Sequence, residues 1–224
     1  MTATTLPECI ELETASHPSH SLIWLHGLGA DGNDFVPVIP ELELPSTVAL
    51  CCIFPHAPLQ AVTCNGGYVM RAWYDILSLS PNERRIDVAG LQASCAAVEA
   101  LIDREVARGI PDSRIILAGF SQGGAVAYSV AFGRTAPLAG VIALSTYIPS
   151  PELLTCLDQH THLPVFVAHG DEDAVVSPVM GQAARQRLLD AGLKPEWRTY
   201  PMGHQVCRPE LRDLGRWIAG LVST

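Results

Sequence analysis

The chain has 224 residues, a length that allows one domain with a sizeable core and leaves little room for a second. Charged residues make up only 17% of the sequence, which excludes an intrinsically disordered chain. The net charge is −9, and Lys194 is the only lysine among the 14 basic residues. Since nucleic acids and anionic membranes are bound by clustered Lys and Arg, we expect no nucleic-acid partner and no stable membrane association.

The seven cysteines are widely spaced and form no C-x-x-C pair, so neither a disulfide framework nor a zinc ribbon is expected. They are typical of small buried hydrophobic residues in a reducing compartment. The first residues include Glu8, Glu11 and Glu13 instead of the basic start and apolar stretch of a signal peptide. No apolar run approaches the ~18 residues of a membrane span. These features together predict a cytoplasmic protein.

Short apolar runs alternate with longer stretches of helical periodicity along the chain. The runs are apolar throughout, as is typical of parallel strands that are covered on both faces. Strands are predicted at residues 21–26, 47–54, 114–119, 139–145, 164–169 and 195–200, with an edge strand at 9–14. Helices are predicted at residues 87–108, 122–133, 178–191 and 208–221. Asp87 can cap the first of these helices, and Gly109 can end it.

This alternation predicts a single α/β domain over residues 1–224, with a mostly parallel twisted sheet and helices on both faces. The longest stretch without a clear element, residues 55–86, is short for a cap domain, so no separate cap is expected. In such sheets the ligand site lies at the carboxyl ends of the strands. Candidate functional residues are therefore sought in the loops that directly follow strands.

One of these loops carries the pattern G-x-S-x-G, with Ser121 at its centre. The pattern is typical of a sharp strand-to-helix turn that holds a nucleophilic serine in a strained backbone conformation. Gly119 and Gly123 let neighbouring chain segments pass without a clash. An apolar run precedes the motif and a helical stretch follows it, and this context favours a nucleophile over an ordinary turn.

A serine hydroxyl needs a base, and His204 is favoured among the eight histidines. It follows the last predicted strand, and it comes after Ser121 and the Asp171–Asp173 segment, in the order Ser, Asp, His. The histidines at other strand ends are interpreted as structural; they are His26, His56 and His169. His160 and His162 are expected in a solvated loop, because no third metal ligand follows them at a useful spacing.

The remaining parts of such a site are an acid that orients the histidine and two N–H groups that bind the oxyanion. Asp171 and Asp173 both follow a predicted strand, and spacing alone does not choose between them. The N–H of Gln122, directly after the serine, is one predicted oxyanion donor. The N–H of Leu28, in the glycine-rich loop after the strand predicted at 21–26, is the other.

These motifs together resemble the carboxylesterase and acyl-protein thioesterase family of the α/β-hydrolase superfamily, over about nine-tenths of the chain. The resemblance implies that Asp173 is the acid, and that Leu28 and Gln122 are the oxyanion donors. It implies a serine hydrolase that cleaves carboxylic esters or thioesters through an acyl-enzyme, with no metal and no organic cofactor. The expected absence of a cap favours small, short-chain acyl esters. The resemblance also suggests a homodimer. The matching segments are Leu25-His26-Gly27-Leu28-Gly29, Pro55-His56-Ala57-Pro58, Trp73-Tyr74-Asp75, Gly119-Phe120-Ser121-Gln122-Gly123-Gly124, His169-Gly170 with Asp173 and Val175-Val176, and Met202-Gly203-His204.

The natural substrate is left open by these residues. A small soluble ester and an acylated partner both fit, and action on long acyl chains, as an acyl-protein thioesterase or lysophospholipase, is the alternative. The segment from Leu59 to Met70 varies within the family, so it does not fix the acyl length. Candidate walls of the substrate pocket are Leu59, Met70, Trp73, Tyr147 and Val176.

A different class of function is suggested by Gly27, Gly29 and Gly32, which also match the dinucleotide-binding pattern G-x-G-x-x-G. That fingerprint requires an acidic residue about 20 positions further on, to bind the ribose hydroxyls. The chain reads Ile53-Phe54-Pro55-His56 there, without an acid. The sequence therefore favours the hydrolase.

Overall fold

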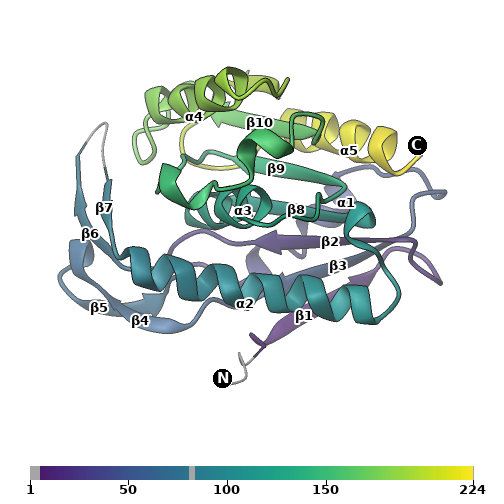
Figure 1. The fold of residues 1–224 in the computed structure, drawn as a ribbon, viewed down its shortest axis with the longest axis horizontal. Coiled ribbons are helices and arrows are strands. Elements are labelled where there is room, and N and C mark those ends of the chain that lie inside the picture. Colours follow the sequence, from purple (N-terminus) through teal and green to yellow (C-terminus); the bar gives the residue numbers. More distant parts are fainter. Residues whose placement is uncertain (1–5, 81–83, 224) are drawn as a thin grey trace.

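The predicted strands lie side by side in one seven-stranded sheet, in the order β1-β3-β2-β8-β9-β10-β11 (Figure 1). The computed structural model describes residues 6–80 and 84–223. All neighbouring strands are parallel except β1, which pairs antiparallel with β3 at the sheet edge. The strands are β1 (Cys9–Glu13), β2 (His20–Leu25), β3 (Leu50–Pro55), β8 (Ile115–Phe120), β9 (Gly140–Leu144), β10 (Val165–Gly170) and β11 (Glu196–Tyr200).

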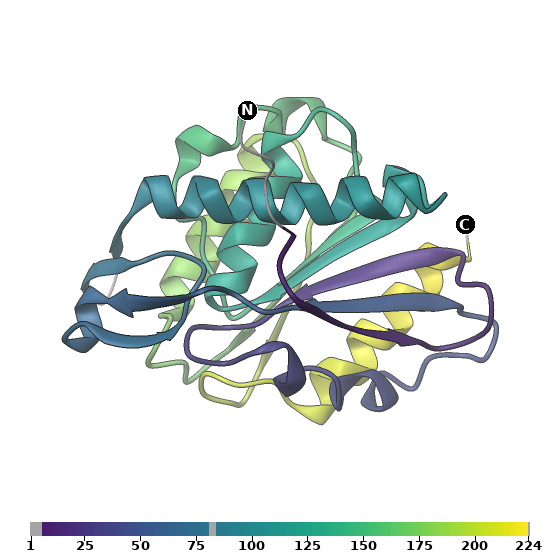
Figure 2. The same ribbon diagram turned by 90° about the horizontal axis from the view of Figure 1, so that it is seen from below.

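Helices cover both faces of this sheet, as the sequence predicts (Figure 2). One face packs against α2 (Val88–Ala107), α3 (Gln122–Gly133) and α4 (Pro178–Asp190). The other packs against the short α1 (Val38–Glu41) and α5 (Arg208–Val222). All four long helices lie within one residue of their predicted ends, and the Asp87 side chain caps α2 by accepting from the Ala89 N–H.

The central strands are mostly apolar because each side of the sheet has its own core. In β2, Leu22 and Trp24 join the core beneath α1 and α5, whereas Ile23 and Leu25 join the core beneath α2, α3 and α4. All four of these side chains are fully buried. Alternate side chains of a strand point to opposite faces, so a strand covered on both sides needs apolar residues at most of its positions.

The segment between β3 and α2 contains two hairpins that the sequence does not predict. They are β4 (Leu59–Val62) with β5 (Tyr68–Arg71), and β6 (Ile76–Leu79) with β7 (Arg84–Ile86). The β4–β5 turn contains Gly66 and Gly67, both with positive φ. Among the described residues these hairpins form no separate cap domain; they extend the sheet's carboxyl edge at one end of the molecule (Figure 1).

The chain order reverses beside β2, whose neighbours are β3 on one side and β8 on the other. The connections after β2 and β8 therefore leave the sheet in different directions and open a crevice at its carboxyl edge. The loops after β2, β8, β10 and β11 all emerge at this edge. They are the loops that carry the candidate residues.

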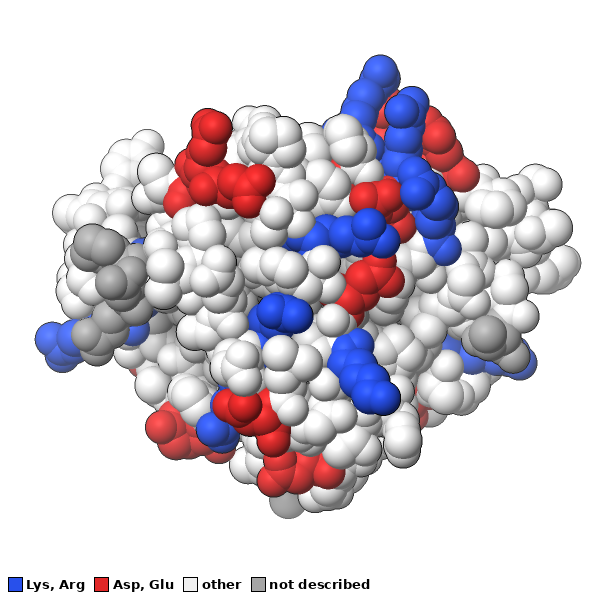
Figure 3. All heavy atoms as spheres, turned by 90° about the horizontal axis from the view of Figure 1, so that it is seen from above, with Lys and Arg blue, Asp and Glu red and all other residues white. Residues whose placement is uncertain are grey.

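Surface charge, helix character and the burial of the cysteines relate to the compartment and partners that the sequence predicts. Figure 3 shows the face that carries α4, where charged side chains of both signs are scattered over a largely uncharged surface. Within residues 6–80 and 84–223, none of the helices has the length and apolar character needed to cross a bilayer. All seven cysteines are free thiols; three are buried and the others are half-buried.

At the start of α5, the fully buried Glu210 accepts a hydrogen bond from the Cys207 N–H at 3.2 Å. Burial raises the pKa of Glu210 to about 8. In the unfolded chain this carboxyl ionises at its ordinary, lower pKa. Glu210 therefore lowers the free energy of unfolding by a growing amount as the pH rises from that ordinary pKa to about 8.

Glu210→Gln should remove this pH-dependent loss of stability while keeping an acceptor for the Cys207 N–H. The free energy of unfolding of the variant, relative to the parent, should rise by about 3 kcal/mol between about pH 5 and pH 8. Urea unfolding at a series of pH values measures the difference. Parallel stability curves for the two proteins would contradict the assigned protonation of Glu210.

Candidate active site

Ser121 lies in the sharp turn between β8 and α3, with φ 54° and ψ −119°. A non-glycine residue with this positive φ is strained, so its surroundings must hold it in place. The Ser121 N–H donates to the Leu144 carbonyl at 2.9 Å, and the Thr146 hydroxyl donates to the Ser121 carbonyl at 2.6 Å. The neighbouring β9 and the residues after it therefore fix the turn. The strained serine predicted from G-x-S-x-G is confirmed.

The two glycines of the motif are required by close packing of backbone on backbone. A Cβ on Gly119 would lie 2.3 Å from the Gly123 carbonyl group, and a Cβ on Gly123 would lie 2.3 Å from the Leu25 carbonyl oxygen. Side-chain carbons do not approach backbone atoms so closely. The first turn of α3 can therefore rest against the end of β2 only if residue 123 is glycine.

Ser121, His204 and Asp173 form one continuous hydrogen-bonded chain across three loops. His204 Nε2 lies 2.9 Å from the Ser121 Oγ, and His204 Nδ1 lies 2.7 Å from the Asp173 Oδ2. The Phe120 ring packs against the His204 ring, with 4.8 Å between their centroids. Ser121 and Asp173 are 8% and 4% exposed, so the chain of hydrogen bonds is largely shielded from water.

The loops that carry Asp173 and His204 are joined by backbone contacts. The N–H groups of Asp171 and Glu172 donate to the carbonyls of Tyr200 and Met202, at 2.9 and 3.1 Å. Gly170 makes this possible, because a Cβ there would lie 2.3 Å from the Met202 carbonyl oxygen. The distance between the acid and the histidine is thus set by backbone hydrogen bonds as well as by their own contact.

The structure distinguishes Asp173 from Asp171, a choice that residue spacing leaves open. Asp173 is buried and Asp171 is exposed. The Asp173 Oδ1 accepts from the N–H groups of Val175 and Val176, at 2.9 and 2.8 Å. Burial acts to raise the pKa of the Asp173 carboxyl, but the hydrogen bond and charge of His204 and the two N–H groups outweigh it and hold the pKa below its ordinary value.

The other strand-end histidines bind backbone, as the sequence interpretation predicts. His26 Nδ1 lies 2.7 Å from the Gly27 carbonyl oxygen, and the Ala57 N–H donates to its Nε2 at 3.0 Å. His56 accepts from the Gly32 N–H, and His169 lies 2.8 Å from the Val176 carbonyl oxygen. Burial lowers the pKa of both His26 and His169, which favours neutral rings.

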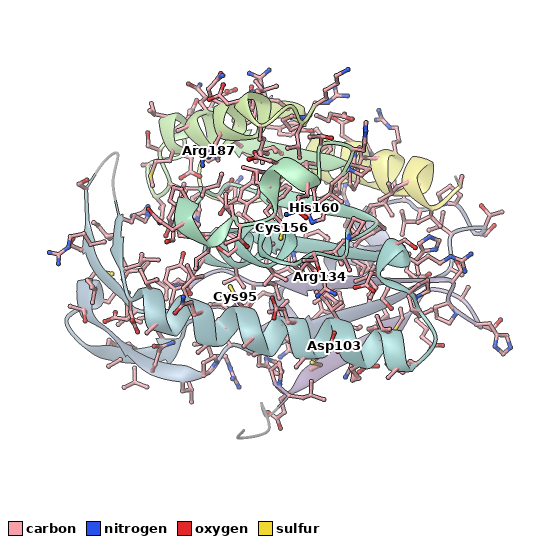
Figure 4. All side chains as sticks on the ribbon, viewed as in Figure 1. Cys95, Asp103, Arg134, Cys156, His160 and Arg187 are labelled. Carbon is pink, nitrogen blue, oxygen red and sulfur yellow. The ribbon has the colours of Figure 1, made fainter. Side chains whose placement is uncertain are left out.

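His160 is an exception to the sequence interpretation, which placed it in a solvated loop. It is only 5% exposed, and its Nε2 lies 2.8 Å from the Arg134 carbonyl oxygen (Figure 4). This contact therefore joins the segment after α3 to the segment before β10. Within residues 6–80 and 84–223, no group of three or more His, Cys, Asp or Glu side chains is arranged to hold a metal ion.

The two predicted oxyanion donors lie beside Ser121. Gln122 is the first residue of α3, so its N–H has no acceptor within the helix. Leu28 lines the same cavity as Ser121, and the adjacent Gly27 packs so closely that a Cβ there would lie 3.4 Å from the Ser121 Cβ. The start of α3 and the loop after β2 therefore both lie beside Ser121.

The Gln122 side chain has a second role that the motif does not indicate. It is 2% exposed, its Oε1 accepts from the Trp73 N–H at 2.7 Å, and its Nε2 donates to the Tyr74 carbonyl at 2.8 Å. The Trp73 indole N–H in turn donates to the His26 carbonyl at 2.9 Å. These bonds attach the segment between the two hairpins to the serine turn and to the end of β2.

A cavity of about 630 Å³ opens beside Ser121 and His204. Its wall is mostly apolar and includes Leu28, Phe120 and Tyr147, with Arg84 as a charged side chain at the wall. The size is within the range of about 300–1,000 Å³ that is typical of small-molecule sites. An apolar organic group can therefore be held next to the serine hydroxyl.

Two of the five predicted pocket residues lie on this wall, namely Tyr147 and Val176, and the other three do not. Leu59 points away on the outer side of β4 and is 66% exposed. Met70 contacts Asn65, whose side-chain amide donates to the Met70 sulfur at 3.5 Å. Trp73 is buried behind the wall. The predictions for Leu59 and Met70 were wrong because the unpredicted β4–β5 hairpin decides which of its side chains face inward. The prediction for Trp73 was wrong because its indole N–H is bonded to the His26 carbonyl, behind the wall.

The glycine-rich loop after β2 lacks the structural context of a dinucleotide site. That fingerprint needs a helix to begin at the loop, and here only the three-residue turn Gly32–Asp34 follows. Gly32 serves packing, since a Cβ there would lie 2.5 Å from the Phe54 carbonyl oxygen. Gly27 likewise lies against the Phe120 ring and the Ser121 Cβ, and Gly29 has a positive φ, so these glycines fit the packing and turn of the loop beside the serine.

Comparison with known proteins agrees with this geometry. The family model described as phospholipase/carboxylesterase matches residues 8–222. The chain belongs to this family. It is 36% identical to an acyl-protein thioesterase 1 of Neurospora crassa, over 85% of this chain and 82% of that protein. The identity to an acyl-protein thioesterase 1 of Mycosarcoma maydis is also 36%, over 92% of both chains.

Among solved structures, Arabidopsis thaliana SOBER1 is similar with a TM-score of 0.82 and 31% sequence identity, over 91% of this chain and 99% of that one. Membership confirms the α/β-hydrolase fold and the prediction of an enzyme. This chain is a serine hydrolase that acts on esters or thioesters.

The packing of residue 123 can be tested with a matched pair of substitutions. Gly123→Ala places a methyl group against the Leu25 carbonyl oxygen, and it should lower the free energy of unfolding by about 3 kcal/mol or more. Gly220→Ala is the control, because its Cβ on α5 meets nothing within 4 Å. It should raise stability by about 0.5–1 kcal/mol, the usual gain in a helix. Equal effects in urea unfolding would contradict the packing argument.

Proposed function

We propose that Ser121, His204 and Asp173 catalyse hydrolysis of carboxylic esters or thioesters through an acyl-enzyme on Ser121. The observation that carries this proposal is the hydrogen-bonded chain from the Ser121 Oγ through both His204 nitrogens to the Asp173 carboxylate. A serine hydroxyl becomes a useful nucleophile when an adjacent base removes its proton. Each group here is within hydrogen-bond distance of the next, as that transfer requires.

In the first half of the reaction, the Ser121 Oγ attacks the acyl carbonyl carbon while its proton passes to His204 Nε2. The carbonyl oxygen becomes an oxyanion, and the N–H groups of Leu28 and Gln122 bind it. His204 then donates the proton to the leaving alcohol or thiol, whose bond to the acyl carbon breaks. Asp173 keeps Nδ1 protonated and stabilises the positive charge that the ring carries between these transfers.

In the second half, a water molecule attacks the acyl-enzyme carbonyl and gives a proton to His204 Nε2. The same two N–H groups bind the second oxyanion. The bond between the Ser121 Oγ and the acyl carbon then breaks, the serine recovers its proton from His204, and the carboxylic acid leaves. Fixed N–H donors at this position typically contribute ~10²–10³ in rate each.

The apolar cavity supports an aliphatic acyl group as the part of the substrate that lies next to Ser121. We propose esters or thioesters of short acyl chains as the substrate class. The similarity to proteins named acyl-protein thioesterase 1 supports a second candidate, a long acyl chain joined to a larger partner. The two candidates share one mechanism and differ in how much chain the cavity must hold.

For surroundings and partners, we propose a cytoplasmic enzyme without nucleic-acid partners and without stable membrane association. Support comes from seven free thiols and a net charge of −9. On the face in Figure 3, the basic side chains form no continuous field of the kind that a phosphate backbone would bind. A homodimer is proposed from the family resemblance alone.

The acid assignment is tested by Asp173→Asn, with Asp171→Asn as the matched control on the same loop. The N–H groups of Val175 and Val176 hold an oxygen at the Oδ1 position, so the amide introduced at residue 173 would turn its NH₂ toward His204 and favour the wrong tautomer. Turnover of p-nitrophenyl butyrate should fall about 10³–10⁴-fold, as for other triads.

Asp171→Asn should change kcat by less than about twofold, because its side chain is exposed and serves no reacting group. Steady-state kinetics at neutral pH, on proteins with matching unfolding curves, supply both values. A larger loss in Asp171→Asn than in Asp173→Asn would transfer the acid to residue 171.

A further inference from the structure

Tyr147 forms part of the wall of two different cavities. On one side is the cavity that holds Ser121, and on the other is a second cavity of about 300 Å³. Among the residues that the structure describes, Tyr147 is the only side chain common to both linings. The ring is 5% exposed although it borders two open spaces. It is therefore a partition between them.

The ring of Tyr147 is fixed by contacts on its edge and on one face. Its hydroxyl shares a hydrogen bond of 2.8 Å with the hydroxyl of Tyr74, which is fully buried. The Arg84 guanidinium, which belongs to the first cavity, lies 5.5 Å from the centre of the ring. Arg84 also donates to the Val175 carbonyl oxygen, in the loop that carries Asp173. These contacts hold the partition in one position.

The second cavity has the apolar wall that an aliphatic chain needs. It runs between α4 and the residues after β9, and Ile148, Pro151, Met180 and Ala184 line it with Tyr147. Arg187, on the exposed side of α4, lies at its outer rim (Figure 4). An acyl chain that passed the position of the Tyr147 ring would continue along apolar side chains toward the surface.

We propose that Tyr147 is the specificity-determining residue that ends the acyl site, so that its ring limits the length of acyl chain the enzyme accepts. This inference rests on the proposed reaction at Ser121. Chains that fit the first cavity bind with their carbonyl at the serine. Longer chains meet the Tyr147 ring, and the second cavity stays outside the substrate path.

The test compares kcat/KM for p-nitrophenyl esters from acetate to palmitate, divided in each protein by its own value for butyrate. This ratio removes differences in folded fraction. The parent enzyme should show a sharp fall beyond a limiting chain length. Tyr147→Ala and Tyr147→Leu should raise the ratio for chains beyond that limit by about tenfold or more. Tyr147→Leu keeps a large apolar side chain in the core.

Two further variants separate the partition from a general change of the site. Tyr147→Phe keeps the ring and should show the same limiting acyl chain length as the parent, even if its kcat/KM values differ. Tyr147→Ala combined with Ala183→Phe, which places a ring in the second cavity from the exposed side of α4, should lose most of the gain. Ala183→Phe alone should leave the ratios unchanged.

An unchanged limiting length in both Tyr147→Ala and Tyr147→Leu would overturn the inference, and so would an equal shift in Tyr147→Phe. A gain that survives Ala183→Phe in the double variant would also contradict the inference, because the longer chains would then not enter the second cavity. Ser121→Ala, assayed alongside, separates the two proposals. Full activity in Ser121→Ala contradicts the reaction mechanism. An inactive Ser121→Ala, together with an unchanged length limit in Tyr147→Ala and Tyr147→Leu, contradicts only the partition.

Discussion

The contact between the first turn of α3 and the end of β2 is the constraint on which the site depends. Gly123 lies against the carbonyl oxygens of Leu25 and His26, so closely that no side chain fits between them. This contact sets the position of the serine turn relative to the loop after β2. It brings Leu28 and Gln122, the predicted oxyanion donors, to the wall of the same cavity as Ser121. A preorganised oxyanion site needs such fixed backbone, since donors that must move to reach the charge contribute less.

The rest of the site is attached to this contact by hydrogen bonds between loops. The Gln122 side chain holds the backbone of Trp73 and Tyr74, which places the two hairpins over the cavity. On the other side, backbone bonds join the loops after β10 and β11, so that Asp173 and His204 face the serine together. Tyr74 then extends the same framework to Tyr147 through their shared hydroxyl contact. The geometry of the Ser121–His204–Asp173 chain and the shape of the cavity beside it are thus linked through one set of buried bonds.

The sequence predicts the sheet and the long helices because local patterns determine them: continuous apolar runs for strands buried on both faces, and a cap and a glycine at the ends of helices. It predicts the serine turn because Gly119 and Gly123 are backbone requirements that appear as residue types. Residue spacing did not choose between Asp171 and Asp173, since that choice depends on which carboxylate the N–H groups of Val175 and Val176 receive. The family resemblance implied Asp173.

The hairpins and the cavity wall were missed for a related reason. Strands of only three or four residues are too short to give a clear periodic signal, and their inward side is set by their partners. Leu59 was expected in the cavity and lies outside because of that pairing. Gln122 was expected to act through its N–H, and nothing in the motif indicates that its side chain is a structural link. Contacts between distant segments decide these features.

The central claim is that the Ser121 oxygen carries the acyl group during turnover. Mass spectrometry of the enzyme, quenched with acid during steady-state hydrolysis of a p-nitrophenyl ester, tests this claim directly. We expect a mass increase equal to one acyl group, located on the peptide that contains Ser121 and absent in Ser121→Ala. Acylation of another residue, or full turnover by Ser121→Ala without an adduct, would contradict the account.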